Sequence, residues 1–112
     1  MPKHFTDYEI VGLSPRLVDM LDKARELSGV PFVITSGARN EAQNANAQGV
    51  KNSAHTRGLA VDLACSDASA RFHMLAALFE VGFARVGIYD KHVHVDCDLS
   101  LPQDVAWWGT SH

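Results

Sequence analysis

The stretch SAHTRGLAVDLA, residues 53–64, contains the clearest strand pattern in the chain and therefore decides the fold prediction. Large apolar residues stand at every second position: Leu59, Val61 and Leu63. This two-residue period is typical of a strand that buries one face, so Asp62 is expected on the opposite, polar face. Gly58 permits a bend before the strand, which would bring His55 back over it.

A second strand pattern lies in HVHVDC, residues 92–97. Its polar face is expected to carry His92, His94 and Asp96, because side chains alternate between the two faces of a strand. The preceding FARVGIY, residues 83–89, has the composition of another strand, and we expect the two to form a hairpin.

These two patterns can share a metal ion if their strands lie side by side. Asp62 and His94 would then converge on one polar face, with His55 folded back beside them. Two imidazoles and one carboxylate suit a zinc ion that keeps a fourth position for water. Each motif alone also fits a solvated strand surface, so the residue pattern by itself leaves both interpretations open.

Two helices are predicted from capping residues and apolar stripes. The first begins with Ser14 and Pro15, an N-cap and a first-turn proline, and ends at Gly29. Its expected buried stripe is Leu17, Met20, Leu21, Ala24 and Leu27. The second is capped by Asp67 and ends at Gly82. Its expected buried stripe is Phe72, Leu75, Ala76 and Phe79.

The order of these elements predicts one α+β domain over residues 1–112. PFVIT, residues 31–35, is expected to be a short buried strand, and LPQDVAWWG, residues 101–109, an aromatic lid over the sheet edge. We expect a mostly antiparallel sheet with the helices packed on one face.

Composition and charge disfavour several classes of protein. The net charge is −3 and the cations are dispersed, which argues against nucleic-acid binding. No apolar run approaches the ~20 residues that span a bilayer, and the N-terminus lacks the apolar segment of a signal peptide. We therefore expect synthesis in the cytoplasm without a signal peptide, and no nucleic-acid or membrane partner.

The two cysteines, Cys65 and Cys97, do not form a CxxC pair, which argues against a cysteine zinc site. The lack of an export signal favours two buried thiols over a disulfide.

Three motifs in order, ITSGARN, SAHTRGLAVDL and GIYDKHVHVD, resemble the M15 zinc peptidases. That family includes D-Ala-D-Ala carboxypeptidases and peptidoglycan endopeptidases, many of them phage-encoded, and its fold is related to the hedgehog signalling domain. The resemblance implies one Zn²⁺ held by His55, Asp62 and His94. It also implies that Ser53 binds the substrate carboxylate and that Arg39 contacts the substrate or the developing oxyanion.

The general base is left open by one departure from the family pattern. Many members carry Glu or Asp three residues before the last histidine ligand, where this chain has Lys91. Lysine is a poor base unless its pKa is strongly lowered. His92, on the ligand face, is favoured for this role, and Asp90 in the expected turn is the alternative.

The resemblance therefore implies a monomeric zinc metallopeptidase that hydrolyses peptidoglycan stem peptides or cross-links, as a carboxypeptidase or an endopeptidase. Its partner would be the bacterial wall peptide, reached after holin-type release or from a virion. A bacterial cytoplasmic dipeptidase of the D-Ala-D-Ala type is a second possibility. A catalytically inactive, zinc-stabilised binding domain of the same fold is the alternative outside the enzymes.

Overall fold

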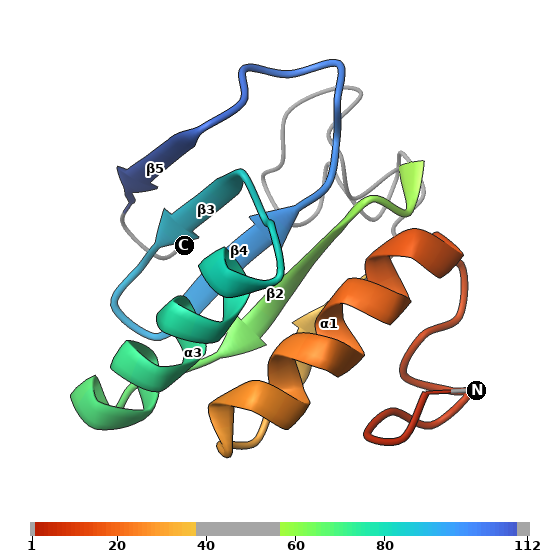
Figure 1. Ribbon diagram of the computed structural model, residues 1–112, viewed down its shortest axis with the longest axis horizontal. Coiled ribbons are helices and arrows are strands. Elements are labelled where there is room, and N and C mark those ends of the chain that lie inside the picture. The colour runs from red at the N-terminus through yellow and green to blue at the C-terminus, as the bar shows by residue number, and fades with distance from the viewer. Residues whose placement is uncertain (1, 38–56, 110–112) are drawn as a thin grey trace.

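The computed structural model describes residues 2–37 and 57–109. The described helices are α1 (Pro15–Ser28) and α3 (Ala68–Glu80), and the described strands are β1 (Ile34–Ser36), β2 (Ala60–Ala64), β3 (Arg85–Ile88), β4 (His92–Asp96) and β5 (Val105–Trp108). The strands form one sheet in the order β1-β2-β4-β3-β5, in which only the β3–β5 pair is parallel. Both helices cover the same face of the sheet (Figure 1). The expected α+β fold is thus confirmed, and neither described helix is long and apolar enough to cross a membrane.

The central strands β2 and β4 provide the floor of the core. Their buried face carries Val61, Leu63, Val93 and Val95, all with no exposed surface. These side chains pack with residues of α1 and α3 in one apolar cluster. Burial of each such side chain contributes roughly 1.5–3 kcal/mol. A register slip by one residue would move Asp62 into this core, so the burial pattern fixes which side chains face away from the helices.

Helix α1 follows its expected boundaries. Pro15 occupies its first turn, and Gly29 adopts the left-handed conformation (φ 69°) that ends the helix. The buried residues are Leu17, Val18, Leu21 and Ala24. Leu27, which the stripe placed in the core, is instead 60% exposed, because the buried face ends with Ala24.

Helix α3 begins as expected but buries a different face. The Asp67 side chain accepts a hydrogen bond from the Ala70 N–H at 2.8 Å, as an N-cap should. The buried residues are Met74, Ala77 and Leu78, whereas Phe72, Ala76 and Phe79 are exposed. Leu75 of the predicted stripe is partly buried against the core, but the other three residues were predicted wrongly. Because α3 is apolar around most of its circumference, helical periodicity cannot select one face.

Strand β1 is shorter than the expected strand 31–35. Its three residues begin at Ile34, and the preceding Val33 is 54% exposed although its carbonyl accepts a bond from Ala64 N–H. Pro31 has no N–H to give to a ladder, which delays the start of regular pairing. Phe32 inserts into the core from outside the strand.

The C-terminal residues 101–109 extend the sheet instead of forming a lid. Asp104 takes a left-handed conformation (φ 60°) and turns the chain into β5. β5 then runs parallel to β3, with Val105 N–H bonded to the Ala84 carbonyl and Gly109 N–H to that of Ile88, both at 3.0 Å. Sequence periodicity could not reveal this pairing, because the apolar pattern within β5 does not indicate that its partner is β3, the outer strand of the β3–β4 hairpin.

Cys65 and Cys97 are both free thiols, as expected. Cys65 is buried and Cys97 is half-buried. Burial raises the pKa of the Cys97 thiol.

Candidate active site

The candidate site lies on the face of the sheet opposite α1 and α3. Strand register places four residues in one row across the sheet: Asp62 of β2, His94 of β4, Gly87 of β3 and Trp107 of β5. The same alternation that buries Val93 and Val95 turns His94 to this opposite face.

Asp62 and His94 meet at the centre of the row. The Asp62 Oδ1 and His94 Nδ1 atoms are 3.1 Å apart, and their side chains are 18% and 16% exposed. The two residues belong to the two motifs that the sequence suggested as halves of one site. The antiparallel pairing of β2 and β4 brings them together, since Asp62 and His94 are direct cross-strand partners.

The other ring nitrogen of His94 is held by a buried carboxylate. Nε2 lies 2.8 Å from Oδ2 of Asp96, a residue that is only 1% exposed. The second oxygen of Asp96 accepts bonds from Arg85 Nε at 2.8 Å and from the Asp98 N–H at 3.2 Å. Burial opposes protonation of His94, but the hydrogen bonds to Asp62 and Asp96 outweigh it and raise the pKa of His94.

This donor pair fits a zinc ion. Two ligand atoms, each ~2.0–2.1 Å from a tetrahedral zinc, are separated by about 3.3 Å, close to the 3.1 Å between Asp62 and His94. A zinc-bound histidine ordinarily donates its other N–H to a carboxylate, which is the arrangement that Asp96 makes with His94. Within residues 2–37 and 57–109, no three His, Cys, Asp or Glu side chains are grouped to hold a metal. The predicted third ligand, His55, lies outside the described residues, as do Arg39 and Ser53.

The two candidates for the general base occupy different places. His92 precedes His94 by two residues on β4, and its ring stacks on Tyr89 with the centroids 4.3 Å apart and the planes 10° apart. Asp90 is exposed in the turn between β3 and β4. Arg71 of α3 binds the carbonyls of Asp90 and Tyr89, both at 3.0 Å, which ties this turn toward the helical side of the sheet. The choice between His92 and Asp90 stays a prediction.

The chain leading into β2 is anchored by two contacts. Gly58 has φ 70°, and a Cβ there would collide with the carbonyl oxygen of Gly12, so only glycine fits the expected bend. Arg57 forms an ion pair with Asp98 and donates to Ser100 Oγ at 3.0 Å. Burial opposes ionisation of Asp98, but hydrogen bonds from Ser100 and the charge of Arg57 outweigh it and lower the pKa of Asp98.

Sequence reasoning missed two residues of the site, Arg85 and Trp107. Trp107 was expected in an aromatic lid over the sheet edge, yet it lies on β5 with its ring centroid 5.6 Å from that of His94. Arg85 stands on the adjacent strand with its guanidinium carbon 5.1 Å from the centroid of the same indole. The period-two pattern of HVHVD did signal Asp96, but no signal in the sequence revealed the parallel strand that supplies Trp107.

Comparison with known families gives a match that covers most of the chain. A family model described as Peptidase M15 matches residues 4–98, which include α1, α3 and the strands β1 to β4. No curated protein gives a significant match to the chain. The matched region contains both Asp62 and His94 and ends before β5.

Proposed function

Because this chain belongs to the M15 peptidase family, we propose that it is a zinc-dependent peptidase that cleaves peptides of bacterial peptidoglycan. The observation that carries the zinc proposal is the Asp62–His94 pair on the sheet face opposite α1 and α3, with the second ring nitrogen of His94 held by a buried carboxylate. The wall peptide as substrate rests on the resemblance of the three sequence motifs.

In this proposal Asp62, His94 and His55 hold the zinc ion. A zinc ion held by these residues would supply Lewis-acid polarisation of the scissile carbonyl and activation of water for attack. Asp96 keeps one ring nitrogen of His94 occupied, so that Nδ1 points toward Asp62. Arg85 in turn neutralises the buried Asp96 carboxylate and holds it in place.

The remaining roles concern the substrate and the proton. His92 accepts a proton at its imidazole from the attacking water and gives it to the leaving amine. Arg39 offers a planar, permanently charged group to a carboxylate or an oxyanion, and Ser53 offers a hydroxyl to the substrate carboxylate. Action on the cell wall, after holin-type release or from a virion, is part of the same proposal.

The experiment measures zinc content and cleavage together. Metal-free protein is reloaded with Zn²⁺, incubated with purified cell walls and with a D-Ala-D-Ala-ended peptide, and the released products are identified by mass spectrometry. We expect one zinc per chain and release of new amino groups. Asp62→Asn should lose both properties, because a neutral amide replaces a ligand carboxylate. The control Asp19→Asn, on the exposed side of α1, should keep both.

Two results would contradict the proposal in different ways. One equivalent of zinc without release of amino groups between pH 5 and 9 would favour the zinc-stabilised binding domain. Lys91, at the position where many family members carry an acid, is the feature consistent with that outcome. Absence of zinc binding in the wild-type protein would refute the metal site itself.

A further inference from the structure

We propose that Trp107 is a positioning residue, which from β5 fixes the ring orientations of both His92 and His94. This inference rests on the proposed function, since it concerns the two histidines assigned to proton transfer and metal binding. It also concerns a strand that lies beyond the residues matched by the family model.

Trp107 reaches His94 because the strand between them carries a glycine. Gly87 of β3 is the direct partner of both His94 on β4 and Trp107 on β5. A Cβ at Gly87 would lie 2.6 Å from Trp107 Nε1, so any other residue would push the indole away. With glycine there, the indole lies over β3 and contacts the His94 ring, with the planes inclined at 46°.

Trp107 is linked to His92 through Tyr89. The indole Nε1–H donates to the Tyr89 hydroxyl at 3.2 Å. The Tyr89 ring stacks flat against the His92 ring, as described above. Gly109, just after β5, leaves room for Tyr89, because a Cβ at this position would collide with the tyrosine ring. The C-terminal strand therefore determines where Tyr89 can lie, and Tyr89 determines the plane of His92.

A second route joins Trp107 to His94 through charged groups. The Arg85 guanidinium lies against the indole and donates to Asp96, which holds Nε2 of His94. Arg85 also donates to the Pro102 carbonyl at 2.6 Å, in the segment that leads into β5. Loss of the indole would free one face of Arg85 and weaken this orientation of the Asp96 carboxylate.

Positioning of this kind acts on the rate of the chemical step more than on substrate binding. A displacement of about 1 Å in a reacting group can lower the rate by about 100-fold. The Trp107 N–H is bonded to Tyr89, and its ring contacts the His94 ring. Removal of Trp107 should therefore leave His92 and His94 in place but with less ordered rings.

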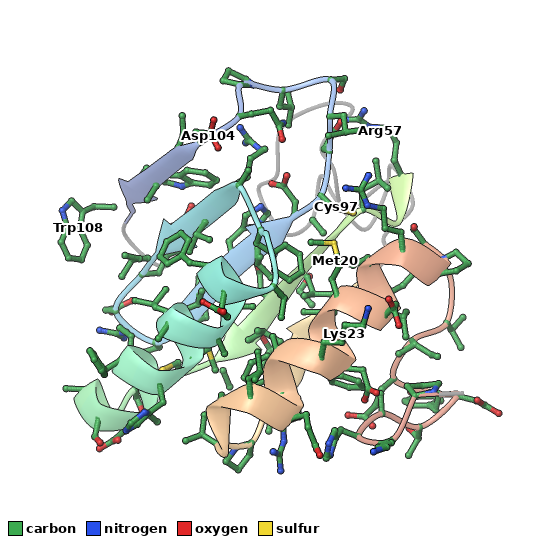
Figure 2. The ribbon with its side chains drawn as sticks, viewed as in Figure 1. Met20, Lys23, Arg57, Cys97, Asp104 and Trp108 are labelled. Atoms are coloured by element: carbon green, nitrogen blue, oxygen red, sulfur yellow. The ribbon has the colours of Figure 1, made fainter. Side chains whose placement is uncertain are left out.

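The experiment compares Trp107→Leu with Trp108→Leu. Trp108 is the adjacent tryptophan of the same strand, is 82% exposed and projects away from the end of β5 (Figure 2). With zinc-loaded proteins and wall peptides, Trp107→Leu should lower kcat by about 10- to 100-fold and change KM by less than about three-fold. Trp108→Leu should match the wild type in both constants.

A spectroscopic readout separates this inference from the proposed function. Imidazole NMR spectra of the metal-free and zinc-loaded proteins report the order of the His92 and His94 rings without any substrate. Trp107→Leu should broaden or shift both sets of ring signals, whereas Trp108→Leu should leave them unchanged. Tyr89→Phe, which keeps the stacked ring but removes the hydroxyl, should affect the His92 signals more than those of His94.

The outcomes are distinguishable. If the wild-type protein cleaves no wall peptide but Trp107→Leu still perturbs both rings, the proposed function fails and the positioning role stands. If Trp107→Leu leaves the ring signals and kcat unchanged, the positioning role is refuted. Should Trp107→Leu fail to fold, an unchanged His92 spectrum in folded Tyr89→Phe would refute the link through Tyr89.

Discussion

The sheet face opposite α1 and α3 has two halves that are built differently. β2 and β4 pair antiparallel over five residues, bury their apolar sides completely and carry Asp62 and His94. β3 and β5 pair in parallel at the sheet edge, and they contribute a glycine and an indole to the same row. The central half supplies the ligand groups, while the edge half supplies the surfaces that orient them. Residues that serve the same site can thus differ greatly in how well the sequence predicts their positions.

The largest expected effect comes from breaking the core under the central half. Leu63 has no exposed surface and packs beneath the strand that presents Asp62. Leu63→Ala should lower the free energy of unfolding by about 2–5 kcal/mol, because it removes buried methyl groups and leaves a cavity. Denaturant unfolding of the metal-free protein measures this loss.

Leu99→Ala is the matched control, since Leu99 is 68% exposed. That variant should stay within about 0.5 kcal/mol of the wild type. Equal losses in the two variants would contradict the view that the central strands depend on this buried face.

A smaller effect should follow from filling the gap in the edge half. Gly87→Ala places a methyl group where the Trp107 indole lies, so the indole or the whole of β5 must move. We expect a loss of about 1–3 kcal/mol in unfolding free energy, as for overpacked sites. Tryptophan fluorescence should change as well, because the environment of Trp107 changes.

Gly37→Ala provides the comparison for that variant. A Cβ at Gly37 meets only ordinary contacts, the nearest at 3.7 Å. Its unfolding free energy should remain within about 1 kcal/mol of the wild-type value. A Gly87→Ala protein as stable as Gly37→Ala, with unaltered fluorescence, would show that the edge strand is not held by this contact.

The smallest expected effect concerns the loop that joins the two halves. Asp98, just after β4, has a lowered pKa because its bonds to Ser100 and its pairing with Arg57 outweigh the effect of burial. A carboxylate with a lowered folded-state pKa stabilises the fold at pH values above its unfolded pKa. That contribution is lost as the pH falls through the folded pKa, below the ordinary value of 3.8.

Asp98→Asn should therefore flatten the acid side of the stability profile. Unfolding free energies measured between pH 2 and 6 give the slope for each protein, and the variant should show the shallower one. Identical slopes would mean that Asp98 does not stabilise the fold through its ionised form.

The central half could be predicted because the apolar pattern within each of its strands determines which face is buried. Alternating apolar residues in 59–64 and 92–97 predicted two strands, their buried faces and the polar faces that carry Asp62 and His94. Capping residues likewise predicted where α1 and α3 begin. The pairing of the two motifs then required only that the strands be neighbours, as they are.

The edge half could not be predicted because it depends on tertiary contacts between segments that are separated in the sequence. Nothing near Trp107 in the sequence indicates that Gly87 is its partner, or that residues 105–108 would pair with β3 instead of forming a lid. The buried face of α3 was misassigned for a related reason. Its apolar residues surround the helix, so only contact with α1 and the sheet selects Met74, Ala77 and Leu78.

The most direct test of the central claim is to locate zinc between the two central strands. Crystals grown with Zn²⁺ are measured at the zinc absorption edge, and the anomalous signal gives the position of the ion. We predict one peak ~2.0–2.2 Å from both Asp62 Oδ1 and His94 Nδ1, with Nε2 of His94 still bonded to Asp96. A peak elsewhere, or none in zinc-saturated crystals, would contradict the proposed metal site.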